Sequence, residues 1–114
     1  MLTADAGGSV TLDTTVASAD VSTSAAGNID IDETNAIVLP DVDANDGAIA
    51  VDAGGQITAT VVASLTASDA TAISLPTNAG DIAVGTVRTG SAGAATLNAA
   101  ANTTVDGSFF VAPL

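Results

Sequence analysis

The chain has no cysteine, histidine, lysine, tryptophan or tyrosine, and two phenylalanines are its whole aromatic content. Without cysteine there is neither a disulfide framework nor a thiolate metal site. For nucleophilic or acid–base catalysis only aspartate, Glu33, serine, threonine and Arg88 remain, without a histidine, cysteine, lysine or tyrosine to work with them. We therefore expect a protein that is not an enzyme and has no catalytic, cofactor-binding or metal-binding residues, apart from a possible calcium site considered below.

Positive charge is almost absent as well. Arg88 is the single basic residue against 13 acidic ones, and the formal net charge is −12. Binding to nucleic acid or to an anionic membrane needs clusters of lysine and arginine, so neither partner is expected. The longest apolar stretches are only a few residues, which predicts no membrane insertion. Met1–Asp5 also lacks the basic start and apolar stretch of a signal peptide.

The apolar residues that are present recur in five repeated units. Each unit has an apolar pair two residues apart: Val10/Leu12, Ile29/Ile31, Ile49/Val51, Ile73/Leu75 and Ala95/Leu97. A second pair follows, five apart except where three extra residues intervene in the third unit: Val16/Val21, Ile37/Val42, Ile57/Leu65, Ile82/Val87 and Val105/Phe110. A single domain, 1–114, then consists of a lead-in, 1–7, and the repeats 8–26, 27–46, 47–70, 71–92 and 93–114.

Repeats of this length predict a β-solenoid, in which each unit buries its apolar face against the next. With so few aromatic side chains the core must be thin, and a coil that only has to cover its neighbour has such a core. The expected fold is an all-β parallel β-helix of about five coils of 19–24 residues. The alternative is an antiparallel β-sandwich, since short apolar strands between polar turns also fit that fold.

Stacking in register makes definite predictions about columns of side chains, because equivalent residues lie about 4.8 Å apart. Two inward columns are expected, formed by Ile29, Ile49 and Ile73 and by Ile37, Ile57 and Ile82. Two acidic columns are also expected, formed by Asp13, Asp32 and Asp52 and by Asp20 and Asp41. Like charges at this spacing repel unless water or a cation separates them.

The segment Asp41–Gly47 resembles a calcium loop, because alternating carboxylates on a turn can converge on a hard cation. It departs from the EF-hand pattern, with Asp46 where glycine is required and Asp52 in place of the final glutamate. The alternative is a plain acidic turn. Asp30 and Asp32 share one strand face and could in principle act as a glycosidase pair, but strand alternation alone produces such pairs.

The pattern G-x-[IV]-x-[IVL], a turn, then [IV]-x-[VL]-x-x-V-x-[AT] is matched by two sets of residues: Gly27, Ile29, Ile31, Ile37, Leu39, Val42 and Ala44, and Ile73, Leu75, Ile82, Val84, Val87 and Thr89. It resembles the repeats of large bacterial surface proteins of the filamentous haemagglutinin type, over about residues 8–112. The resemblance implies a right-handed parallel β-helix in a secreted adhesin or structural fibre, without catalytic residues.

The expected function is therefore that of a non-enzymatic structural or adhesive repeat protein, extracellular or at the cell surface, with an unknown surface ligand. Self-association end to end is also expected, with Phe109, Phe110 and Leu114 supplying apolar contact. In the competing interpretation, residues 1–6 and 109–114 cover the ends and keep a monomer. Two other functions stay open: a pilus-like β-sandwich subunit that polymerises by strand exchange, and a small enzyme or lectin on a β-helix.

Overall fold

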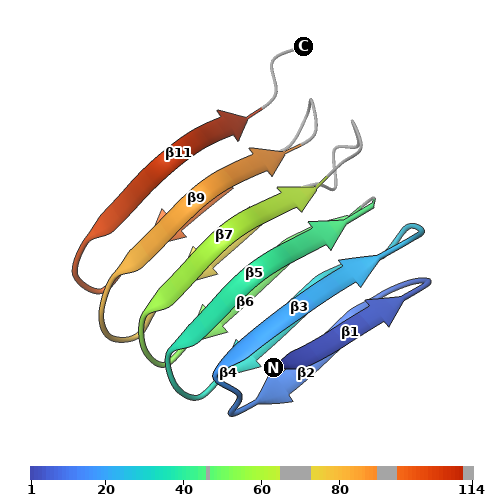
Figure 1. Ribbon diagram of the computed structural model, residues 1–114, viewed down its shortest axis with the longest axis horizontal. Helices are drawn as coiled ribbons and strands as arrows, with labels where there is room; N and C mark the ends of the chain where they lie inside the picture. The colour runs from blue at the N-terminus through green and yellow to red at the C-terminus, as the bar shows by residue number, and fades with distance from the viewer. Residues whose placement is uncertain (46, 65–72, 90–94, 112–114) are drawn as a thin grey trace.

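Two parallel sheets face each other across the apolar core (Figure 1). The computed structural model describes residues 1–45, 47–64, 73–89 and 95–111, the last six by their backbone alone. These residues form strands and no helix. The six-stranded sheet, called sheet A, has the order β1 (Leu2–Ala6), β3 (Ser18–Thr23), β5 (Ile37–Ala44), β7 (Ile57–Ser64), β9 (Ile82–Thr89) and β11 (Thr103–Val111). The five-stranded sheet, called sheet B, contains β2 (Val10–Thr14), β4 (Ile29–Glu33), β6 (Ile49–Ala53), β8 (Ile73–Pro76) and β10 (Ala95–Asn98), with β2 and β10 at its edges.

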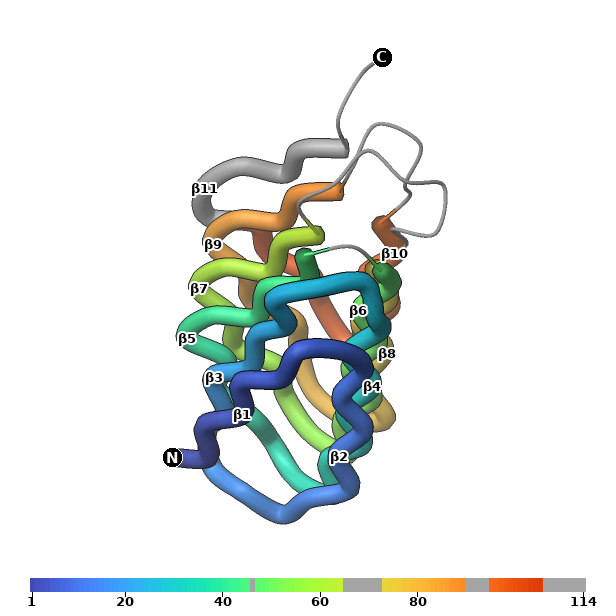
Figure 2. The backbone as a smooth tube through the Cα atoms, turned by 90° about the vertical axis from the view of Figure 1, so that its right-hand side faces the viewer, coloured from blue at the N-terminus to red at the C-terminus, as the bar shows by residue number. Residues whose placement is uncertain are grey.

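The chain alternates between the sheets, so each coil adds one strand to sheet B and one to sheet A (Figure 2). Every pairing between the described strands is parallel. The fold is therefore a β-solenoid, as predicted, and the alternative antiparallel sandwich is not supported.

The inward columns of sheet B follow directly from alternation along short strands. Ile29 is in register with Ile49, and Ile49 with Ile73. All three side chains are buried, as are the Ile31, Val51 and Leu75 side chains of the neighbouring column. The predicted column of Ile29, Ile49 and Ile73 is confirmed. Outward positions between them carry aspartate, alanine and serine, which gives each strand one apolar and one hydrated face.

Sheet A contains a bend that explains the pair of apolar residues five apart. A straight strand would place Ile57 and Val62 on opposite faces, because side chains alternate with period two. Both are fully buried, because Thr60 and Val61 lie consecutively on the outer side and shift the alternation by one residue. The same doubled outward step occurs at Pro40 in β5, where a register shift against β3 accommodates a residue without an N–H. The predicted column Ile37, Ile57 and Ile82 is confirmed by register and burial.

Two of the predicted pairs are corrected by the register. In the third repeat Val62, not Leu65, pairs with Val42 and Val87, and Leu65 lies outside the described residues. In the fifth repeat Phe109, not Phe110, is in register with Val87. Here Val105 is opposite Val84 instead of Ile82, and a register shift lies between Val105 and Ser108. The turn lengths differ between repeats, so counting from one apolar residue misplaced these partners.

Close approach of successive coils explains glycine at two corners. A Cβ on Gly54 would lie 1.9 Å from the Thr34 carbonyl oxygen of the preceding coil. A Cβ on Gly47 would lie 2.1 Å from the Gly27 carbonyl oxygen, and Gly47 also has a φ of +154°. Any other residue at these corners would have to push the coils apart.

Candidate functional site

An exposed acidic column runs along the outer face of sheet B. Asp13 is in register with Asp32, and Asp32 with Asp52. All three side chains are exposed, and Asp52 Oδ1 accepts a 3.5 Å hydrogen bond from Asn78 Nδ2. The predicted column is confirmed, and hydration of these carboxylates tolerates their close spacing. Asp30 shares this exposed face, so the Asp30/Asp32 pair lies on an open strand surface.

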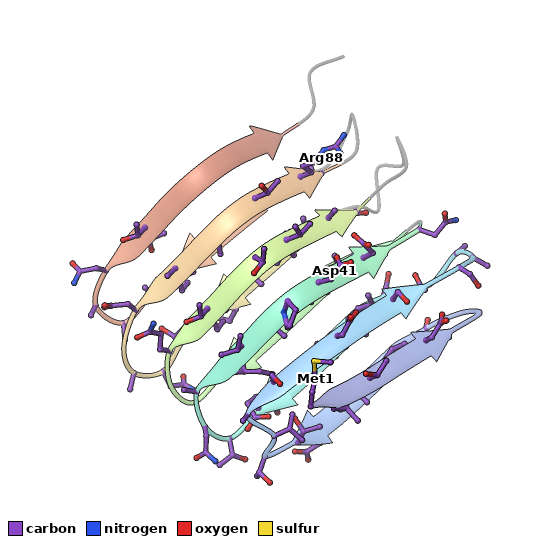
Figure 3. All side chains as sticks on the ribbon, in the orientation of Figure 1. Met1, Asp41 and Arg88 are labelled. Atoms are coloured by element: carbon purple, nitrogen blue, oxygen red, sulfur yellow. The ribbon has the colours of Figure 1, made fainter. Side chains whose placement is uncertain are left out.

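A second acidic group, called the sheet A cluster, consists of Asp20, Asp41 and Asp43. Asp41 lies on β5 (Figure 3) and is in register with Asp20 on β3, as predicted. Asp43 follows two residues later on β5. Burial raises the pKa of Asp43 to about 6, aided by the negative charge and hydrogen bonding of Asp41 and by the charge of Asp20. Among the described residues, Asp41 Oδ1 is a buried oxygen without a hydrogen-bond partner. Ionisation of Asp43 is therefore less favourable than that of an exposed aspartate.

Arg88 occupies the same outer face of sheet A, toward the end of β9 (Figure 3). Asp43 is in register with Ala63, and Ala63 with Arg88. The single cation of the sequence is therefore two strands away from Asp43, about 10 Å at the usual strand spacing. At this distance its charge is largely screened by salt.

The calcium hypothesis concerned the segment from Asp41 to Asp46. Asp41–Ala44 belongs to strand β5 instead of a turn, and Asp46 lies outside the described residues. Among the residues with described placement, no group of three or more histidine, cysteine, aspartate or glutamate side chains is arranged to hold a metal ion. Calcium binding stays an untested prediction.

Glu33 is a buried carboxylate that the sequence interpretation did not single out. It ends β4 on the inward face, where its carboxylate accepts hydrogen bonds from the Thr14 hydroxyl, from the Val16 N–H at 3.0 Å and from the Asn35 N–H at 3.2 Å. Side chains alternate along β4, so the inward Ile29 and Ile31 place residue 33 on the inward face as well. The sequence therefore did contain a signal for the burial of Glu33. These bonds tie the corners of two successive coils together, which gives Glu33 a structural role.

A shallow open hollow of about 240 Å³ lies over β7 and β9 on the outer side of sheet A. Its lining includes Thr58, Thr60, Ala83 and Gly85, and no carboxylate takes part. Small side chains, above all the missing one at Gly85, create this hollow. Its shape and lining do not identify a ligand.

The two ends of the solenoid expose apolar side chains at sheet edges. At the N-terminal end, called the head, Leu2, Ala4, Ala6 and Leu12 are partly buried against the core. At the other end, called the tail, the partly buried apolar side chains against the core are Ala95, Leu97 and Ala99. Phe109 and Phe110 belong to β11, the edge strand of sheet A, and Leu114 lies outside the described residues. Edge strands of this kind are the usual places where one sheet pairs with another.

No family model, curated protein or solved structure matches this chain. Within the residues whose placement is described, no helix is long and apolar enough to cross a membrane.

Proposed function

We propose that this chain is a structural or adhesive segment of an extracellular or cell-surface fibre, built in the manner of filamentous haemagglutinin repeats, and that it performs no catalysis. One observation carries the proposal: two parallel hydrogen-bonded ladders run the length of the described chain and end at apolar, partly exposed edges. Such a ladder is extended by adding a further coil, because each new strand meets the same backbone pattern and the same inward columns.

The charge distribution supports an axial fibre over lateral clumping. The outer face of sheet B carries the exposed acidic column of Asp13, Asp32 and Asp52. The outer face of sheet A carries the sheet A cluster. Two rods side by side would bring these carboxylates together, and self-repulsion keeps them apart in solution. The ends present mainly apolar side chains and backbone groups, so contact there is less repulsive.

Sedimentation and negative-stain imaging of the purified 114-residue chain over a wide concentration range test this proposal. Association into linear assemblies that lengthen with concentration is the expected result. Leu97→Ser should weaken it, because Leu97 lies at the tail in β10. Val38→Ser is the matched control, because Val38 is 46% exposed on the flank of β5. Self-assembly would be contradicted if the chain sedimented as a single sharp monomer boundary at high concentration, and if replacing Phe109 and Phe110 with serine left that boundary unchanged.

A further inference from the structure

The two sheets are staggered at both ends of the solenoid. Of the described strands, the first, β1, and the last, β11, both belong to sheet A, whereas β2 and β10 are the edges of sheet B. Sheet A therefore extends half a coil beyond sheet B at the head and again at the tail. When two copies meet through their sheet A edges, a gap of one strand, about 10 Å between backbones, remains in sheet B.

We propose that copies of this chain join head to tail, with β11 of one copy taking the place of β1 in the next. This inference rests on the proposed self-assembly and specifies its partner and geometry. With β1 displaced, β11 pairs with β3 of the next copy, and β10 pairs with its β2. Both ladders then continue without a gap.

The register shows that β11 fits the place of β1. Ala4 is in register with Val21, and Val21 with Val42. The same column continues through Val62 and Val87 to the backbone position of Phe109. Ala4 and Phe109 therefore hold equivalent places, and β11 spans nine residues where β1 spans five. β3 has six residues, and β1 already pairs with five of them, so β11 can replace β1 without loss of this ladder. The gain from the exchange is the closed gap in sheet B.

Sheet B gains a matching contact at the same junction. By the register of the stacked strands, Ala95 would lie opposite Val10 of the next copy, and Leu97 opposite Leu12. These residues are the ends of the two inward columns of sheet B. Joining them removes the partly exposed Leu97 and Leu12 side chains from water.

Charge also distinguishes the two ends. Ten of the thirteen acidic residues lie within residues 1–53, which contain no basic residue. Two heads in contact would juxtapose two acidic halves, whereas a head on a tail places an acidic half against a nearly neutral one. Tail-to-tail contact avoids this repulsion but leaves the gap in sheet B. A head-to-tail contact is also heterologous and does not close, so it generates filaments of unlimited length.

The first experiment tests polarity by disulfide trapping, since the chain has no cysteine of its own. Thr11 in β2 and Thr96 in β10 are exposed outward positions that would be opposite each other at the junction. Their Cα separation, about 5 Å between neighbouring strands, suits a disulfide. We expect a mixture of the Thr11→Cys and Thr96→Cys variants to form a mixed dimer on mild oxidation, and the double variant to form a ladder.

The second experiment tests the displacement of β1. Thr3 and Asp20 are opposite each other in β1 and β3, so the Thr3→Cys/Asp20→Cys variant can lock β1 in place when oxidised. The oxidised form should stay monomeric, and the same protein after reduction should assemble as the unmodified chain does. The reduced form is the matched control for the loss of the Asp20 charge.

The outcomes separate the two proposals. Disulfides within the Thr11→Cys variant alone, or the Thr96→Cys variant alone, would overturn head-to-tail polarity while leaving self-assembly intact. A disulfide that joins the Thr96→Cys variant to the Thr3→Cys variant, and not to the Thr11→Cys variant, would indicate that the copies stack with a rotation of half a revolution. This result would overturn the exchange. Assembly of the oxidised locked variant would overturn it as well. Absence of every cross-link in a protein that sediments as a monomer would contradict the self-assembly itself.

Discussion

Replacing Asp43 with asparagine should stabilise the folded protein at neutral pH. Asp43 lies beside Asp41 on β5 and near Asp20 on β3, on a face where Ser22 and Ala63 are its register partners. Burial and the two carboxylates raise its pKa from 3.8 to about 6. At pH 7.5 the folded protein therefore holds an ionised group in surroundings that favour the neutral form, and asparagine removes this cost.

The sign of the pH dependence follows from linkage. Because the folded pKa of Asp43 lies above the unfolded one, the proton stabilises the folded state fully below about pH 3.8. This contribution is lost as the pH rises through about 6. Asp43 is half-buried, and water screens its interactions, so about 1 kcal/mol is a reasonable magnitude for the loss.

Urea unfolding followed by far-UV circular dichroism measures the effect, since the chain lacks tryptophan and tyrosine for fluorescence. At constant ionic strength the unmodified protein should lose about 1 kcal/mol more between pH 3.8 and 7.5 than Asp43→Asn does. The free energies of unfolding of the two proteins should converge below about pH 3.8, where the Asp43 carboxyl is protonated in both the folded and the unfolded state. Asp30→Asn is the control, because it removes the same formal charge from an exposed site opposite Ala50. Equal slopes for Asp43→Asn and the unmodified protein would refute the reasoning.

Three further substitutions test the core, the corners and the buried carboxylate, each by denaturant unfolding. Ile57→Ala should cost about 2–5 kcal/mol because the side chain is fully buried between two coils, whereas Thr58→Ala on the outer face should cost less than about 0.5; similar costs would contradict the inward column. Gly54→Ala should destabilise strongly, because its Cβ would overlap the preceding coil, and Gly7→Ala, with nothing within 4 Å, should have little effect. Glu33→Gln should cost about 1–3 kcal/mol, since an amide cannot accept at both oxygens from the corner donors; a neutral result would show that these bonds contribute nothing net.

The fold could be predicted largely because its signal is repeated. Ile29, Ile49 and Ile73 recur at one place in their repeats, and each is buried where alternation places it. Register in a parallel stack is set by such columns, since a slip by one residue would turn every apolar side chain outward. The acidic columns followed from the same register, without any knowledge of side-chain environment.

Other features depend on geometry that spacing does not carry. The pairing of Phe109 with Val87 depends on the register shift in β11, and counting residues placed Phe110 there. The raised pKa of Asp43 depends on how far its strand buries it, which alternation alone does not give. Glu33 was visible as an inward position, but its carboxylate finds donors only once two coils are stacked.

Each described strand packs chiefly against the strands of the coils before and after it. A duplicated coil would therefore introduce no contact of a new kind and would require no change elsewhere in the chain. Unequal recombination between similar repeats can lengthen or shorten such a gene by whole coils, and the product keeps a complete core. Length thus becomes a property that natural selection can adjust separately from sequence, which would suit the fibre role proposed above.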